Sequence, residues 1–107
     1  MIRIALTPKE KQDVFSLMTS KELELRRRRQ GTLHKHGPKK AGKLKWIHKS
    51  YKGWIQLQRC IGGVVVALVQ SKAVDGENLL LSSFIGFVDR HFARQLTSIT
   101  ISYESDG

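Results

Sequence analysis

The fold of this chain is decided by residues 62–69, which read GGVVVALV. The run that follows the two glycines is apolar and rich in β-branched side chains, as in a central strand covered on both faces or nearly so. Two consecutive glycines give the backbone the freedom that a tight hairpin turn needs. We therefore expect residues 64–69 to form a central strand that pairs with the strand before the turn.

Two strands are expected before this turn. Ile55 and Leu57 alternate with glutamines, and Leu44 and Trp46 alternate with lysine and isoleucine. Alternation with a period of two residues is the pattern of a strand with one buried face. A turn at residues 50–53 is expected to join these two strands.

The C-terminal part of the chain predicts a helix and a last strand. Asp75 is a suitable N-cap, and residues 80–92 repeat apolar side chains over an unusually broad helical face. After this helix, Ile99, Ile101 and Tyr103 alternate with serine and threonine. That alternation indicates a half-buried strand.

The N-terminal part predicts a short strand or extended arm at residues 2–6, followed by a helix. Thr7 can cap this helix, Pro8 suits its first position, and Glu10 completes a Thr-x-x-Glu capping box. A second such box begins at Thr19. The helix therefore either continues to the following run of arginines or breaks near Thr19.

Together these patterns predict one α+β domain over residues 1–107. We expect an antiparallel or mixed sheet of about four strands, with two helices packed on one face. The expected order is short strand or arm, helix, basic loop, three strands, helix, strand. Residues 26–42 are expected to form a basic arm or flexible loop, because they contain a single large apolar side chain among arginine, lysine, histidine, glycine and proline.

Charge is unevenly distributed along the chain. There are 19 Lys and Arg against 9 Asp and Glu, which gives a formal net charge of +10. The first 60 residues contain sixteen of the bases and four of the acids, and no acid occurs between Glu24 and Asp75. Such a stretch repels itself unless a counter-charge comes from outside, so we expect a polyanionic partner.

Two parts of the acid-free stretch are candidate contacts to nucleic acid. Four consecutive arginines at 26–29 cannot all pack against one core, and guanidinium groups match phosphate oxygens. Residues 43–54 interleave both tryptophans with four lysines, a composition typical of surfaces that stack bases and follow a phosphate backbone. The predicted interface comprises Arg26, Arg27, Arg28, Arg29, Lys35, Lys39, Lys40, Lys43, Lys45, Trp46, Lys49, Lys52, Trp54 and Arg59.

Each candidate has a plainer interpretation. The arginines would also suit a solvated cationic tail without a partner, or a nuclear-localisation signal. Trp46 and Trp54 would also suit the core of a hairpin whose opposite face carries the lysines. That second alternative removes base stacking but leaves a basic strip.

The residues do not favour an enzyme. The acids of the C-terminal half show no paired spacing for metal or acid–base catalysis, and Asp75 suits a helix N-terminus instead. Cys60 is the only cysteine, so an intrachain disulfide is excluded. His34, His36 and His48 lie among lysines, which disfavour a bound cation. We therefore expect neither a metal nor another cofactor.

The sequence predicts a small, basic, non-enzymatic protein that binds RNA or DNA through its phosphates with low sequence specificity. The alternative is a protein-interaction or homo-oligomeric assembly module, in which the strand at 98–103 pairs with a second copy to form a homodimer. We expect a cytoplasmic protein without a signal segment or membrane span, since the apolar run at 61–69 is about half as long as a bilayer crossing requires.

Overall fold

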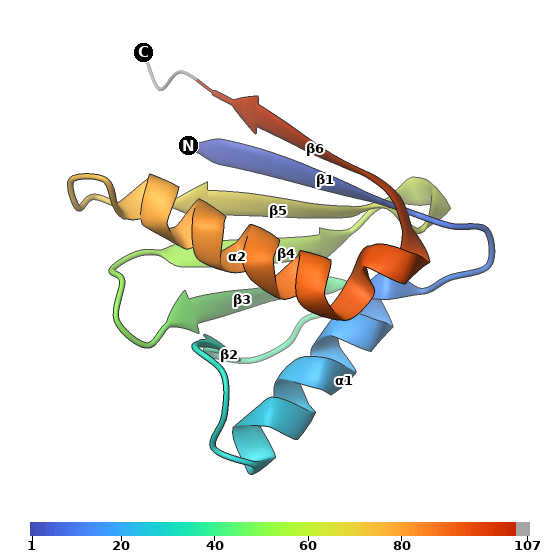
Figure 1. Cartoon of the computed structure of the whole chain (residues 1–107), viewed down its shortest axis with the longest axis horizontal. Coiled ribbons are helices and arrows are strands. Elements are labelled where there is room, and N and C mark those ends of the chain that lie inside the picture. The colour runs from blue at the N-terminus through green and yellow to red at the C-terminus, as the bar shows by residue number, and fades with distance from the viewer. Residues whose placement is uncertain (105–107) are drawn as a thin grey trace.

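Six strands form one antiparallel sheet in the computed structural model, which describes residues 1–104. The strands are β1 (Ile2–Pro8), β2 (Leu33–Lys35), β3 (Lys43–His48), β4 (Trp54–Arg59), β5 (Val65–Gln70) and β6 (Leu96–Tyr103). They lie in the order β2-β3-β4-β5-β1-β6 across the sheet (Figure 1). Helices α1 (Val14–Arg27) and α2 (Gly76–Phe92) complete the fold, with short 3-10 turns at Ile61–Gly63 and Ala93–Gln95.

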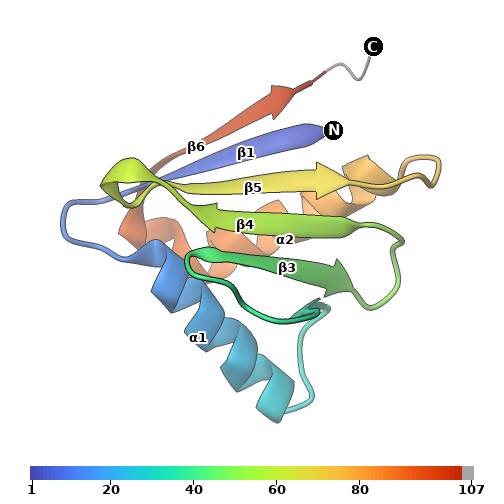
Figure 2. The same ribbon diagram turned by 180° about the vertical axis from the view of Figure 1, so that it is seen from behind.

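Both helices pack against the same face of the sheet, as the two opposite views show (Figures 1 and 2). We call this side the helix face and the other side the open face. No helix of residues 1–104 covers the open face. Ile4, Leu6, Ile55, Leu57 and Val69 point to the helix face and are completely buried. The predicted α+β class, with two helices on one face, is confirmed.

The predicted central strand is also confirmed. Strand β5 pairs with β4 on one side and with β1 on the other. Strand β1 in turn lies between β5 and β6, so the N-terminal segment is an inner strand of the sheet and not an arm laid on the core. The first and last strands of the chain are therefore neighbours.

The sheet has six strands, which is more than the four or so expected. The prediction missed β2, which lies within the segment expected to be a basic arm or loop. Leu33 of this strand is buried, and it pairs with His48 of β3. Three residues are too few for an alternating pattern to stand out from the polar residues around them. Beyond β2 the backbone stays bonded to β3, since the His36 N–H donates to the Lys45 carbonyl at 2.8 Å.

Helix α1 begins later than the capping box at Thr7 predicts. Thr7 and Pro8 instead pair with β6, so strand pairing prevails over the local helix-start signal. The helix begins after Asp13, whose carboxylate accepts hydrogen bonds from the Ser16 backbone N–H at 3.2 Å and from the Ser16 hydroxyl at 2.8 Å. It continues without a break through Thr19 to Arg27.

Trp46 connects β3 to α2. Its side chain is completely buried, and its indole meets the rings of Phe84 and Phe87 edge to face, with centroids 6.3 and 5.3 Å apart. The broad apolar face of α2 is buried by the sheet through these two rings and through Leu80 and Val88. A six-stranded sheet thus covers more of this helix than a four-stranded one would.

The corrected start of α1 can be tested by comparing two acidic residues. Replacing Asp13 removes the cap, so Asp13→Ala should lower the free energy of unfolding by about 1 kcal/mol. Glu10→Ala removes the same charge from an exposed position before the helix, and should change the free energy by less than about 0.5 kcal/mol. Urea denaturation measures both. An equal or larger loss in the Glu10 variant would show that the cap is misplaced.

Candidate nucleic-acid interface

Strand register determines which side chains share the open face. In an antiparallel sheet, paired residues project to the same side and successive residues alternate. Lys45 pairs with Gln56, Gln56 with Leu68, and Leu68 with Arg3. These side chains form one row across the open face, opposite the buried residues of the same strands. Lys43 begins the adjacent row, which continues through Gln58.

Trp54 lies on this face at the start of β4. It is only half-buried, and the Nζ of Lys45 lies 5.1 Å from its ring centroid. The ring borders a hollow of about 390 Å³ that is also lined by Lys52 and Lys72. Gly53 has a φ of +117°, and a Cβ there would collide with the backbone carbonyl of Gln70, so only glycine allows the chain to enter β4 in this way.

A second hollow, of about 330 Å³, lies where the β2–β3 connection meets β3. Lys40, Lys43 and Lys45 line it together with Pro38 and Gln56. The connection is held in place by reciprocal backbone hydrogen bonds between Lys40 and Lys43, at 2.9 and 3.0 Å. We use the name open-face cluster for the aromatic ring and the five lysines of these two hollows: Lys40, Lys43, Lys45, Lys52, Trp54 and Lys72.

Carboxylates lie away from the open-face cluster. Strands β2 to β5 contain none, because the sequence has no acid between Glu24 and Asp75. At the far end of the sheet, Glu104 forms an ion pair with Arg3 at 2.7 Å and neutralises that arginine. The lysines of the open-face cluster form no ion pair among residues 1–104.

Trp46 and Arg59 are predicted interface residues that lie elsewhere. Trp46 is in the core, so its ring is closed to a base in this structure. Arg59 projects to the helix face, where its guanidinium lies 4.9 Å from the Phe15 ring centroid and bonds both carboxylate oxygens of Asp13, at 2.9 and 3.0 Å. Partial burial alone would raise the pKa of Asp13, but the hydrogen bonds from Ser16 and Arg59 outweigh it and lower this pKa.

Of the four arginines, Arg26 and Arg27 end α1, and Arg28 and Arg29 follow it directly; this helix packs on the helix face, whereas the open-face cluster lies on the other side of the sheet (Figure 2). Two of them are engaged within the helix: Arg26 pairs with Glu22 at 3.2 Å, and Arg28 with Glu24 at 3.4 Å. Arg27 and Arg29 have no ion pair within residues 1–104. The structure therefore divides the predicted interface into two separate basic surfaces.

Lys35 and Lys39 belong to the surface around α1. They line a hollow of about 220 Å³ between this helix and β3, together with Arg26 and Glu22. The Nζ of Lys39 lies 5.6 Å from the Phe15 ring centroid. Lys49 lies in the β3–β4 turn, and it is exposed.

Two features of these surfaces have no clear signal in the sequence. Lys72 joins the open-face cluster from the near-neutral half of the chain, where an isolated lysine predicts nothing. Glu22 is almost completely buried, and its carboxylate contacts the His34 ring at 3.0 Å as well as Arg26. Only the tertiary fold brings His34 to this helix.

His48 organises the turn that carries Lys49 and Lys52. Its Nδ1 accepts hydrogen bonds from the backbone N–H groups of Ser50, at 2.9 Å, and Tyr51, at 3.1 Å, and its ring stacks on that of Tyr51. Burial lowers the pKa of His48. A neutral ring with an unprotonated Nδ1 is the form that this turn requires.

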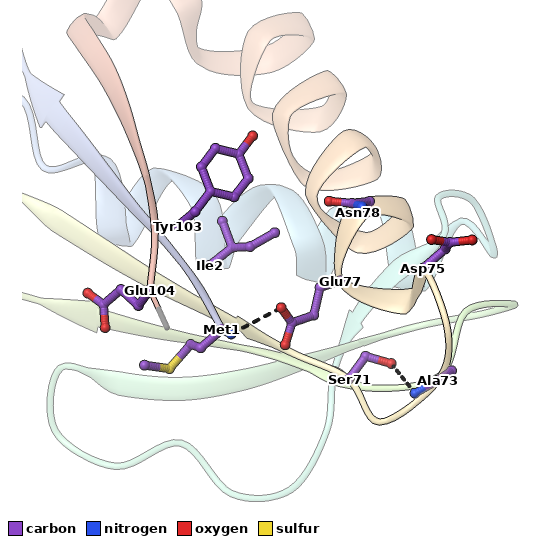
Figure 3. Close-up of a pocket in the computed structure, with 9 residues that line it drawn as sticks. All are labelled: Met1, Ile2, Ser71, Ala73, Asp75, Glu77, Asn78, Tyr103 and Glu104. Carbon is purple, nitrogen blue, oxygen red and sulfur yellow. Dashed lines mark hydrogen bonds and ion pairs between the residues drawn. The ribbon is translucent and has the colours of Figure 1, made fainter. Parts of the chain in front are cut away.

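A further hollow, of about 400 Å³, lies at the end of the sheet beside the start of α2 (Figure 3). Its walls include Asp75, Glu77 and Glu104. The carboxylate of Glu77 forms an ion pair with the amino group of Met1 at 3.1 Å. Three carboxylates make this hollow unsuitable for a phosphate group.

No group of three or more His, Cys, Asp or Glu within residues 1–104 is arranged to hold a metal ion. No helix in that part of the chain is long and apolar enough to cross a membrane. Compared with protein-family models, curated proteins and solved structures, the chain shows no significant match.

The role of His48 predicts a pH dependence of stability. Because its pKa is lowered in the folded state, the contribution of His48 is fully present above pH 6.5, the ordinary value, and is lost as the pH falls through the lower folded value. The free energy of unfolding should therefore fall below pH 6.5. An asparagine accepts the same backbone N–H without titrating.

We accordingly expect a weaker pH dependence below that value in His48→Asn than in the original protein. Urea denaturation on both sides of pH 6.5 measures the difference, and a histidine NMR titration gives the folded pKa directly. An unchanged slope in the variant, or a His48 midpoint above 6.5, would contradict this account.

Proposed function

We propose that this protein binds single-stranded nucleic acid through the open-face cluster, without catalysing a reaction on it. The observation that supports the proposal is Trp54: a half-buried ring that borders an open hollow on an acid-free part of the sheet, with the Lys45 ammonium over it. An exposed aromatic ring surrounded by lysines is the arrangement with which sheets bind single strands, because bases stack on the ring while the cations contact phosphates.

Lys45 has a different role in the free and the bound protein. A cation over an exposed aromatic ring is worth about 0.5–1 kcal/mol, whereas stacking of a base on such a ring is worth about 1–3 kcal/mol. A base therefore displaces the ammonium group from Trp54. The released Lys45 remains beside the ring and can contact the phosphate of the same nucleotide.

The remaining lysines extend the contact in two directions from Trp54. Lys52 and Lys72 lie beside the ring, Lys43 lies farther along β3, and Lys40 lies in the β2–β3 connection next to Lys43. Contacts of this kind are electrostatic and do not distinguish one sequence from another. The carboxylates beyond Ala73, in the hollow beside the start of α2, repel phosphate and limit how far the bound nucleic-acid strand extends at that end (Figure 3).

The lysines of β3 are expected to determine the salt dependence of binding. In Lys43→Gln/Lys45→Gln, two phosphate contacts are lost, so the slope of log K against log salt for a single-stranded oligonucleotide should become shallower by about 1.4. The control is Lys9→Gln/Arg90→Gln, which removes the same charge from exposed positions outside the cluster. Fluorescence anisotropy at several salt concentrations measures both.

Loss of affinity in the control equal to that in the β3 variant would show that net charge, and not this face, drives binding. An absence of binding at low salt in the unaltered protein would refute the proposal itself.

The two tryptophans should behave differently, because one is buried and one is at the interface. In Trp46→Phe the only indole is Trp54, so iodide should quench its fluorescence and an oligonucleotide should protect it. In Trp54→Phe the remaining indole, Trp46, should respond to neither. Trp54→Ala should weaken binding by about 1–3 kcal/mol. An oligonucleotide effect confined to Trp46 would place the site elsewhere.

A further inference from the structure

The two edges of the sheet differ in how well they are protected. Edge strands expose unpaired backbone groups, and proteins usually block them with short strands, lysines, prolines or bulges. Edge β2 has three residues, includes Lys35, and is followed by Pro38. Edge β6 has eight residues, LTSITISY, with neither a charge nor a proline, and its register shift against β1 lies at its start, next to Thr97, so the rest of the strand is regular. Only β6 is available for pairing with another strand.

The hydrogen bonds of β6 show which of its backbone groups are free. The N–H of Glu104 donates to the Met1 carbonyl at 2.9 Å, so the backbone of Glu104 points toward β1. Backbone direction alternates along a strand. The N–H and C=O groups of Ile99, Ile101 and Tyr103 therefore point outward from the sheet, whereas Thr97 lies at a register shift where this alternation is interrupted.

The same strand leaves apolar side chains uncovered on the helix face. Ile101 and Tyr103 pair with the core residues Ile4 and Ile2 and project to the same side. Yet Ile101 is 38% exposed and Tyr103 is 71% exposed, because α2 covers the sheet only as far as β1 at this end. The edge therefore offers both free backbone groups and an apolar strip.

We propose that β6 pairs with β6 of a second copy of this chain, antiparallel about a two-fold axis that passes through Thr100. In this register Ile99 lies opposite Ile101 of the partner copy, and Ile101 lies opposite Ile99. Each of these outward-facing residues then donates and accepts one backbone hydrogen bond, and the apolar strips of the two copies join. The two-fold axis runs perpendicular to the sheet, so both open faces lie on the same side.

Charge favours a second copy as the occupant. Two chains of net charge +10 repel each other, and repulsion is smallest where their bases are farthest apart. The bases concentrate around β2 and β3, at the opposite edge of the sheet, whereas β6 is uncharged and its neighbour Arg3 is neutralised by Glu104. When two copies of β6 pair about a two-fold axis, each copy satisfies the free backbone groups of the other, so no different partner is required.

Engineered cysteines test the register, in a Cys60→Ser background that removes the free thiol. Thr100 lies opposite its own copy in a non-hydrogen-bonded pair, whose Cα separation of about 4.5–5.5 Å suits a disulfide. Thr100→Cys should therefore form a covalent dimer under mild oxidation by air. Ser102→Cys should not, because the two copies of residue 102 are about 13 Å apart in this register.

A paired control separates this contact from random collision. Ser98→Cys/Ser102→Cys should cross-link, since residue 98 of one copy lies opposite residue 102 of the other. Sedimentation of the unaltered protein at micromolar and millimolar concentrations should show a dimer at the higher one. A monomer at both concentrations would overturn the proposal, and so would cross-linking of Ser102→Cys as fast as Thr100→Cys. Neither readout depends on nucleic acid.

Discussion

Trp46 fills the space between β3 and α2, and the rest of the molecule is arranged around its burial. A strand alternates, so once Trp46 points to the helix face, Lys45 must point to the open face. Trp46 pairs with Ile55, which buries Ile55 and directs Trp54 to the opposite side. The core position of one tryptophan thereby determines the exposure of the other. The lysine-aromatic surface is a geometric result of packing α2 on the sheet.

Much of the fold is predictable because its signals are local and redundant. Residues 64–69 read as a central strand from composition alone, and the glycine pair before them marks the turn between β4 and β5. The last strand and the second helix are equally clear from their periodicity. All of these segments are long relative to the repeat that identifies them.

The predicted start of α1 was wrong, and the reason is physical. The capping box at Thr7 and Glu10 is a valid local signal, but Thr7 is also bonded by Thr97, ninety positions later in the chain, whose hydroxyl donates to the Thr7 carbonyl at 3.2 Å. Local sequence holds no information on that partner. The sequence also did not predict that the basic segment divides into two surfaces. Lys39 and Lys40 are neighbours in sequence, yet they line hollows on different sides of the sheet.

The net charge of the chain does not show which basic side chains are free of an ion pair within the protein. Arg3, Arg26, Arg28 and Arg59 are each paired with a carboxylate, and Arg59 fixes the start of α1 to the end of β4. Arg59 makes charge-assisted hydrogen bonds to Asp13, and the other three arginines form ion pairs with nearby carboxylates. The cations without an ion pair among residues 1–104 include the five lysines of the open-face cluster, and also Arg27 and Arg29 at the end of α1. Whether a basic side chain is already paired within the protein therefore depends on whether the fold places a carboxylate beside it.

The position of β1 has a consequence for how the chain folds during synthesis. Among the strands of this sheet it is the first to be synthesised, yet its two partners, β5 and β6, begin only at Val65 and Leu96. Until those strands emerge, Ile2, Ile4 and Leu6 stay without the neighbours that bury them. Contacts between residues so far apart in sequence slow folding and prolong the exposure of apolar segments to chaperones and to aggregation. The sheet can close only when the last strand has been made.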